Sequence, residues 1–534
     1  MKQLFVIIAA AATLIACGNQ IPSTFEESAE LPGIYPDYTN VTVPVNIAPL
    51  TFEADGKSDG IVARLTVGEE EVVCGGTKVQ PDADDWKRLT EHARGNTIKV
   101  EVYIENDDQW TRFKPFNIYV SPDSIDPYIS YRLIAPSYVT YEELTISQRC
   151  LENYDESVVY DNMLCSADNA GQCINCHNYQ QYNPERMQFH ARQNLGGTVI
   201  AYDGKVRKIN MSSDSILSAG VYPAWHPWLP LIVYSTNKTV QTFHITNPDK
   251  IEVYDTSSDL IAYDVEKNEV TNIENDPEEL EVFPFWAPDG KTLYYCSAHF
   301  EYKDTIDQGL EFIQRFKEAK YNIYKKSFDT ETYSFGPREL VFAADSLEKS
   351  ATLPRISPDG RFLMFTLGKY GVFHIWHSDA DLWMMDLSRC EVRGSRYEVR
   401  GTRYEDSAEA DSSGVKGNLA PRTSQLAARN MKEINSDNVE SYHSWSSNGR
   451  WVVFSSRRDD GNYTRPFFAH IDKDGHATKP FELPCADPHY HRQFLKCYNI
   501  PEFMKGPVTI RPQEFADVLK REGEPVKYVH ELRK

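Results

Sequence analysis

The chain has 534 residues and a formal net charge of −22 at pH 7. A chain of this length is too long for one compact core, so we expect two or three domains. The negative charge argues against a nucleic-acid-binding protein, because phosphate recognition needs clustered Lys and Arg side chains that this sequence does not display.

The first residues have the form of an export signal. Met1-Lys2-Gln3 precedes an apolar stretch from Leu4 to Ile15, which is shorter than the roughly 20 residues needed to cross a bilayer. The quartet Leu14-Ile-Ala-Cys17 resembles a bacterial lipobox, which implies cleavage before Cys17 and lipid attachment to its sulfur. We therefore expect a signal peptide over residues 1–16 and an exported protein anchored by lipid alone. The expected location is the outer membrane, facing the periplasm, with the cell surface as the alternative.

Residues 17–39 are predicted to be a linker, and residues 40–135 a β-sandwich-like domain. Within the second range, strand-like runs alternate with clusters of Gly, Asp and Asn, as is typical of an all-β sandwich. The runs are Val41–Val45, Ile61–Leu65, Thr97–Ile104 and Phe116–Val120.

Residues 136–195 contain the motif Cys173-Ile-Asn-Cys176-His177. This is the form Cys-x-x-Cys-His, in which two thiols bond the vinyl groups of one haem and the following His reaches the iron. Chance would produce such a match roughly 0.005 times in a chain of this composition. We therefore predict one haem c attached through Cys173 and Cys176, with His177 as an axial iron ligand.

The sixth iron ligand is predicted to be His190, with Met187 as the alternative. A His/His pair gives a lower reduction potential than a His/Met pair. The segment is too short to wrap a porphyrin alone, so the haem is expected to lie against the sandwich, the propeller described below, or both. Two other interpretations of the motif stay open: a redox disulfide between Cys173 and Cys176, and a zinc site that adds Cys165 and His177 or His190.

A repeat begins at about residue 196. Four copies share a strand, a tight turn and a second strand. In the turn, Pro288 or Pro358 presets φ, Asp289, Asp359 or Asn448 accepts the turn conformation, and Gly290, Gly360 or Gly449 supplies a positive φ. The copies are Tyr222–Ser235, Phe283–Ser297, Leu353–Thr366 and Tyr442–Ser455.

These copies resemble the TolB-type repeat with its Pro-Asp-Gly hairpin, which implies a β-propeller over residues 196–510. Five or six blades are expected, and six are preferred by analogy with the family. Residues 511–534 are predicted to be a C-terminal tail. Tyr302–Lys320 has a helix-like mixture of apolar and charged residues, and Arg393–Ala428 has the composition of a flexible loop.

The chain as a whole resembles exported propeller lipoproteins of Bacteroidota-type bacteria with a single haem-attachment motif. One hypothesis is electron transfer with a protein partner. The other is a propeller that binds a protein, glycan or cell-wall ligand, with a structural or sensory haem.

No catalytic constellation stands out in the sequence. A peroxidase-like activity is therefore expected only if the sixth iron position is open. Acidic residues near the blade ends, among them Glu252, Asp255, Asp259 and Asp437, are expected in solvated loops.

Overall fold

A computed structural model describes residues 20–135, 143–165, 172–193, 195–247, 249–303, 306–393, 396–399 and 428–534. The described chain divides into two compact modules. The N-terminal module consists of residues 20–122 and 484–490, and the main module of residues 123–483 and 491–534. In the part that the structure describes, no helix is long and apolar enough to cross a membrane.

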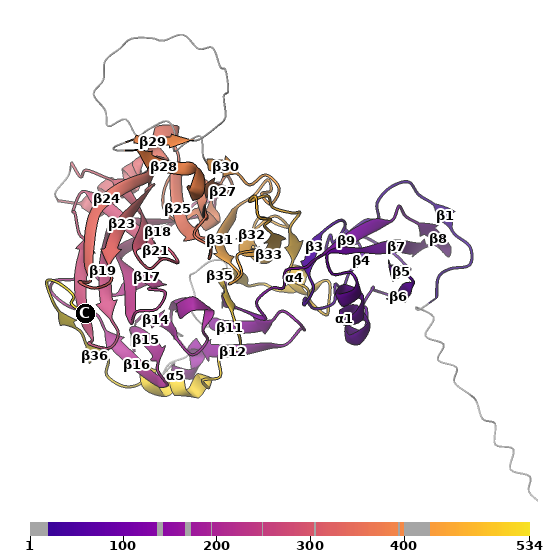
Figure 1. Ribbon diagram of the computed structural model, residues 1–534, viewed down its shortest axis with the longest axis horizontal. Coiled ribbons are helices and arrows are strands. Elements are labelled where there is room, and N and C mark those ends of the chain that lie inside the picture. Colours follow the sequence, from indigo (N-terminus) through magenta and orange to yellow (C-terminus); the bar gives the residue numbers. More distant parts are fainter. Residues whose placement is uncertain are drawn as a thin grey trace, which may run out of the picture. The chain divides into compact units, whose positions relative to one another are not determined.

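The N-terminal module, drawn in indigo and violet in Figure 1, is built on a seven-stranded sheet. The central path of this sheet is β1-β8-β7-β5-β6, and β9 pairs with both β7 and β3. All four predicted strands are present, as β3, β5, β7 and β9. The elements are β1 (Glu26–Glu27), β2 (Ile34–Tyr35), β3 (Thr42–Pro44), β4 (Glu53–Ala54), β5 (Gly60–Val67), β6 (Glu70–Gly76), α1 (Ala83–His92), β7 (Asn96–Asn106), β8 (Gln109–Arg112) and β9 (Phe116–Ser121).

A helix takes the place of part of the predicted sandwich. Asp82 caps α1 by accepting a hydrogen bond from the main-chain N–H of Asp84 at 2.9 Å. Trp86 is buried and donates from Nε1 to the carbonyl of Ile47 at 2.9 Å. The described residues thus form one large sheet, the small sheet of β2 and β4, and a helix. Residues 20–39, predicted to be a linker, carry β1 and β2 of this module.

The main module has a β-propeller arrangement. Its described strands include six groups of four antiparallel strands, which we call sheets A to F, and one bridge joins sheets B and C into a larger sheet. Sheet A consists of β13 (Ile174–Tyr179), β14 (Met187–Ala191), β15 (Gly197–Tyr202) and β16 (Lys205–Asn210); sheet B of β17 (Gly220–Trp225), β18 (Leu231–Phe243), β19 (Ile251–Asp264) and β20 (Glu269–Glu274); sheet C of β21 (Glu279–Trp286), β22 (Thr292–His299), β23 (Asn322–Asp329) and β24 (Ser334–Phe342); sheet D of β25 (Ser350–Ile356), β26 (Phe362–Gly368), β27 (Asp381–Asp386) and β30 (Ala428–Asn430); sheet E of β31 (Glu440–Trp445), β32 (Trp451–Ser456), β33 (Arg465–His470) and β34 (Phe481–Glu482); and sheet F of β35 (Cys497–Met504), β10 (Tyr128–Ile134), β11 (Thr145–Cys150) and β12 (Glu156–Asp161).

The innermost strands of these sheets contact one another in a ring. Each neighbour in the order β13, β17, β21, β25, β31, β35 touches the next, and β35 touches β13. Figure 1 shows β17, β21, β25, β31 and β35 toward the middle of this module. Sheets B and C are further joined by one parallel bridge between Ser258 and Leu280.

Sheets B to E contain the four hairpins predicted from the repeat, and the turns of sheets C, D and E have the expected chemistry. In sheet C, Gly290 has φ +57°, and the Asp289 carboxylate accepts from the main-chain N–H of Lys291 at 2.8 Å. Gly360 and Gly449 also have positive φ in sheets D and E. The Pro-Asp-Gly pattern therefore identifies these hairpins because it meets the backbone demands of the turn.

Two segments that were predicted to lie outside the propeller contribute strands to its sheets. Residues 136–195, predicted to be a separate haem segment, provide β11 and β12 to sheet F and β13 and β14 to sheet A. Residues 511–534, predicted to be a tail, hold α5 and the short strands β36 and β37. β36 pairs with β16, and β37 pairs with β20.

The predicted helical insertion contains α2, whereas most of the predicted loop Arg393–Ala428 lies outside the described residues. The remaining elements are α2 (Gln308–Arg315), β28 (Cys390–Arg393), β29 (Arg396–Val399), α4 (Tyr490–Gln493), α5 (Pro512–Leu519), β36 (Glu524–Pro525) and β37 (Lys527–Tyr528).

Candidate functional site at the centre of the propeller

Every innermost strand has the same irregularity at its middle. One residue takes a left-handed conformation with φ between 49° and 57°, and the pairing register shifts beside it. In strand order the left-handed residues are Cys176, Tyr222, Phe283, Leu353, Tyr442 and Ile500. The residues that follow them are His177, Pro223, Pro284, Pro354, His443 and Pro501. Cys176-His177 therefore occupies the position that Tyr222-Pro223 occupies in the next sheet.

The two faces of sheet A contact different neighbours. Ile174, Met187 and Phe189 belong to one apolar cluster with residues of sheet F such as Ile146 and Tyr160. Cys173 precedes Ile174, and side chains alternate along a strand, so the Cys173 side chain is placed on the opposite face, toward sheet B.

The irregularity separates Cys176 from His177. The Cys176 thiol lies beside the backbone of Tyr222 in sheet B, and burial raises its pKa. The His177 ring lies near the backbone of Ser130 and Ile500 in sheet F, but neither ring nitrogen makes a hydrogen bond of ordinary geometry. Burial and the positive charge of Arg132 lower the pKa of His177 to about 4. The imidazole is therefore neutral at neutral pH.

The two predicted sixth ligands are separated in the same way. Met187 is fully buried in the apolar cluster with sheet F. His190 lines a cavity with Asn237 and Thr239 of sheet B, and its Nδ1 lies 3.2 Å from the Thr198 hydroxyl. Burial lowers the pKa of His190 to about 3.

The arrangement does not fit a porphyrin held by the whole motif. A c-type haem needs both thiols at one edge of the macrocycle and the imidazole at its iron, whereas here Cys176 lies beside the backbone of sheet B and the His177 ring beside that of sheet F. The unpaired His177 ring does not itself indicate a metal, because His443 at the equivalent position is equally buried and unpaired. No group of three or more His, Cys, Asp or Glu side chains placed to hold a metal ion occurs in the described ranges, including around Cys165. Cys17 lies outside these ranges.

Other histidines of the main module have structural partners. His226 bonds the carbonyl of Gly290 at 2.8 Å, and His374 bonds the hydroxyl of Thr352 at 2.9 Å. His377 lies 3.0 Å from the carboxylate of Glu252. Each ring thus holds its own segment in place.

A cavity of about 660 Å³, partly open to solvent, lies where the innermost strands end. We call it the channel mouth. Every one of the six sheets contributes to its lining. The residue two places after each left-handed position faces it in turn: Asn178, Ala224, Phe285, Arg355, Ser444 and Glu502.

The polar side chains of the channel mouth form one group. Glu502 accepts hydrogen bonds from Ser444 Oγ at 2.8 Å and from Asn178 Nδ2 at 3.4 Å. The Arg355 guanidinium lies 3.7 Å from the Glu502 carboxylate and 4.8 Å from the centre of the Phe285 ring. Among the described residues, no hydrogen-bond acceptor is paired with the side chain of Arg355.

Burial shapes the electrostatics of this group. It lowers the pKa of Arg355 and raises the pKa of Glu502, and the opposite charge of the partner counteracts both shifts. Arginine stays protonated in proteins, so the guanidinium keeps its charge and its donors. A partly desolvated guanidinium with unused donors, beside an aromatic ring, is suited to a planar anionic group such as a carboxylate.

Sequence reasoning did not identify Arg355, Glu502, Asn178 or Ser444. A signal was present at the third residue of each aligned copy. That residue is Ala224, Phe285, Arg355 and Ser444 in turn, whereas its neighbours are similar from copy to copy. Because the residue type at this third position differs from copy to copy, the repeat does not require one side chain there, and the position can serve a binding site.

Comparisons with known proteins give structural similarities alone. No family model matches the chain, and no curated protein matches it. A prolyl oligopeptidase B from Galerina marginata is 11% identical, with a TM-score of 0.31 over 73% of this chain. This chain covers 42% of the length of that protein.

Two further solved structures are similar at the same level. A GH74 enzyme from Niastella koreensis is 9% identical, with a TM-score of 0.33, over 71% of this chain and 44% of its own. The β-propeller domain of Cps50 (Swd1) from Myceliophteria thermophila is 11% identical, with a TM-score of 0.27, over 59% of this chain and 86% of its own. The chain is a β-propeller protein with a distant resemblance to these propellers, and none of their activities is transferred to it.

Proposed function

We propose that this protein is a binding module that holds an anionic group of a small ligand, or of a residue within a glycan or peptide, at the channel mouth. The observation that carries the proposal is the Arg355 guanidinium, which donates no hydrogen bond to a described residue, lies 3.7 Å from the Glu502 carboxylate and has its face against Phe285. Asn178 and Ser444 are already bonded to Glu502, which leaves Arg355 as the group available to an incoming anion.

The test compares ligand pairs that differ only in a carboxylate. Suitable pairs are N-acetylphenylalanine with its amide, and glucuronic acid with glucose, measured by isothermal titration calorimetry. The acid of at least one pair is expected to bind more tightly than its neutral partner. A hydrogen bond to a charged group contributes about 1.5–3 kcal/mol, which corresponds to about 10- to 100-fold in affinity.

Arg355→Gln removes the charge and is expected to abolish the preference for the acid. Arg361→Gln serves as the matched control, because Arg361 pairs with Asp386 at 2.9 Å and does not line the channel mouth. Equal affinities for acid and neutral partner in the wild-type protein, or a preference that survives Arg355→Gln, would overturn the proposal.

We also propose that all six sheets form one closed propeller of the TolB-like type. The ring of contacts among the innermost strands and the shared left-handed position support six blades. The Pro-Asp-Gly turns of sheets C and D, and the Asn-Gly turn of sheet E, support the TolB-type repeat.

Haem-based electron transfer with a protein partner stays a second candidate. The Cys-x-x-Cys-His motif supports it, and the contacts of Cys176 and His177 with different neighbouring sheets weigh against it. Protein purified from a host with haem-maturation machinery decides the matter by intact mass and visible absorption. A mass equal to that of the processed polypeptide, with no absorption band, would remove this candidate.

Export and lipid anchoring are the remaining part of the proposal. They rest on the apolar stretch before Cys17 and on the lipobox-like quartet. Cys17→Ser is expected to move the protein from the membrane fraction to the soluble fraction. A variant that stays membrane-bound would contradict the lipid anchor.

A further inference from the structure

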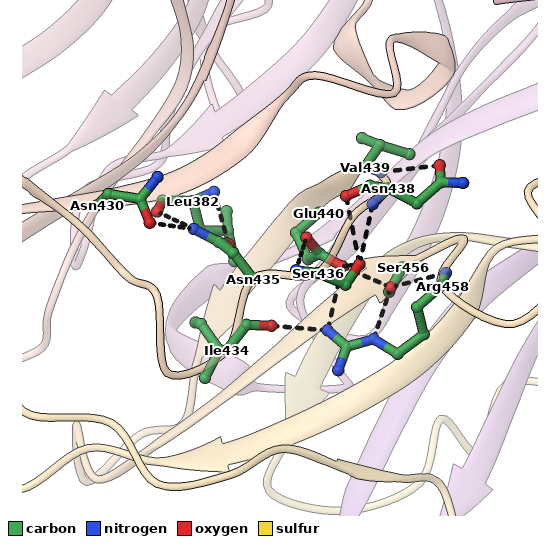
Figure 2. A network of polar contacts seen from close by, with 10 residues as sticks. All are labelled: Leu382, Asn430, Ile434, Asn435, Ser436, Asn438, Val439, Glu440, Ser456 and Arg458. Carbon is green, nitrogen blue, oxygen red and sulfur yellow. Dashed lines mark hydrogen bonds and ion pairs between the residues drawn. The ribbon is translucent and has the colours of Figure 1, made fainter. Parts of the chain in front are cut away.

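A buried glutamate in sheet E shows how this fold satisfies a carboxylate between two sheets. Glu440 is 0% exposed and pairs with Ser456 of the adjacent strand. Its carboxylate accepts from Ser436 Oγ at 2.6 Å and Ser456 Oγ at 2.7 Å, and lies 3.1 Å from Arg458 Nη2. Figure 2 shows these contacts converging on Glu440. Two hydroxyls and one cation thus balance one buried charge.

Glu281 occupies the same position in sheet C. It is also 0% exposed, and it lies two residues before the left-handed Phe283, as Glu440 lies two before Tyr442. Neither carboxylate oxygen of Glu281 has a hydrogen-bond partner among the described residues.

The residues that would satisfy Glu281 are engaged elsewhere. Ser297, which pairs with Glu281 as Ser456 pairs with Glu440, donates to Glu279 at 2.6 Å. His299 stands two residues after Ser297, where Arg458 stands in sheet E, and it lies 3.4 Å from Glu279. Sheet C therefore has the buried carboxylate without its cation.

Further unpaired oxygen atoms surround this carboxylate. The Tyr295 hydroxyl is buried and unpaired, on the same strand face as Ser297, and its pKa is raised in part by the charge of Glu281. Ser258 of β19 is bridged to Leu280, the neighbour of Glu281, so its side chain lies on the face opposite to those of Glu281 and Asp259. Asp259 follows Ser258, and its carboxylate has no hydrogen bond or ion pair in the described ranges.

The pKa values of Glu281 and Asp259 are both raised. Burial raises the pKa of Glu281 to about 9, and the charges of Glu274, Asp259 and Glu279 add to the shift. Burial also raises the pKa of Asp259 to about 6. Glu274 is paired with Lys326, and Glu279 with Arg338 at 3.2 Å. Neither Glu281 nor Asp259 forms an ion pair with a described residue, although the charge of Lys238 counteracts the pKa shift of Asp259.

We propose that Glu281 and Asp259 bind a hard divalent cation of the calcium class between β19 and β21, with the hydroxyl of Tyr295 beside it. Oxygen-only donors match such a cation, and the charge of the bound cation would allow Glu281 to give up its proton. The set contains two acidic residues, so it is not a cage of three or more acidic side chains. Main-chain carbonyls and water supply the remaining ligands that calcium requires. The site is separate from the channel mouth and does not rest on the function proposed for it.

The first experiment uses the full chain after removal of metal with a chelator. Adding CaCl₂ is expected to raise the midpoint of thermal unfolding by several degrees. TbCl₃ is expected to give terbium luminescence on excitation of tyrosine, because Tyr295 lies beside the site. Excess CaCl₂ should displace the terbium and quench that signal.

The decisive variant is Glu281→Gln, which keeps the side-chain shape and removes the buried charge. It is expected to abolish both the calcium-dependent rise and the terbium signal, while its metal-free midpoint equals or exceeds that of the wild type. Asp259→Asn is expected to weaken calcium binding at least tenfold. Glu278→Gln, which removes an exposed carboxylate three residues away, is expected to change neither measurement.

Two results would overturn the proposal. One is a wild-type protein whose unfolding midpoint and terbium luminescence do not respond to either ion, which would leave Glu281 as a buried neutral acid. The other is terbium luminescence that persists at full strength in Glu281→Gln, which would assign the cation to another part of the chain.

Discussion

At the scale of single residues, His177 is one of six equivalent residues that directly follow the left-handed residue of an innermost strand. Four of the six residues that follow the left-handed position are prolines, and the other two are His177 and His443. Proline has a fixed φ and no N–H to donate. Its presence at four equivalent places indicates that the fold needs neither a donor nor another φ there.

We therefore predict that His177→Pro folds with nearly wild-type stability. Two unpaired ring nitrogens cost about 1–3 kcal/mol each when buried, and their removal offsets the packing lost with the ring, so the free energy of unfolding should change by less than about 1 kcal/mol. Urea titration followed by tryptophan fluorescence measures it. Gln188→Pro, in the middle of β14, serves as the control and should destabilise strongly because that strand pairs on both sides. A His177→Pro variant as unstable as the control would contradict the equivalence of the six positions.

Glu281 makes a second residue-scale prediction, on pH. In metal-free protein its folded pKa of about 9 lies above the unfolded value of about 4.3. Between these values the folded state holds a proton that the unfolded state has lost, so this contribution to stability falls as pH rises. The slope is at most about 1.4 kcal/mol per pH unit. The difference in unfolding free energy between wild type and Glu281→Gln, measured from pH 5 to pH 9, should follow this sign. A difference that is constant with pH would show that Glu281 titrates normally.

At the scale of strands and sheets, local chemistry decides what the sequence reveals. The hairpins of sheets C, D and E were predictable because each turn needs a positive φ, and Gly290, Gly360 and Gly449 supply it. Sheet A lacks that turn signal, and its innermost strand carries a motif that indicates haem chemistry instead. Sheet F joins β10 to β35, which are far apart in the chain, and single-chain periodicity does not reveal which distant strands pair.

The joined construction of sheet F predicts unequal effects of two truncations. A chain that ends at Leu483 loses β35 and should not give a cooperative unfolding transition. A chain that ends at Arg521 keeps β35 and α5 but loses β36, β37 and the buried Leu532. This second variant should unfold cooperatively with a stability lower by about 2–4 kcal/mol, since burial of one large apolar side chain contributes about 1.5–3 kcal/mol. Differential scanning calorimetry distinguishes the two, and equal behaviour would contradict the role of β35 as a closing strand.

At the scale of the whole molecule, the channel mouth collects one residue from each of six sheets. No single segment of the sequence contains this site, and its polar members come from strands as distant in the chain as β13 and β35. The candidate site was therefore less predictable than the hairpins. Its residues acquire a common location only after the ring of innermost strands has formed.

The last prediction follows from the net charge of −22, because a negatively charged protein repels the anionic ligand proposed for Arg355. At low ionic strength the whole molecule repels an anion over a Debye length of about 30 Å, and at 0.15 M over about 8 Å. The contact with the partly buried guanidinium is screened much less. Affinity for an anionic ligand identified by calorimetry should therefore rise a few-fold between about 0.01 and 0.15 M salt, through faster association. Stopped-flow measurements separate the two rate constants. An affinity that falls with salt would indicate that the anion binds exposed Lys or Arg side chains instead of Arg355.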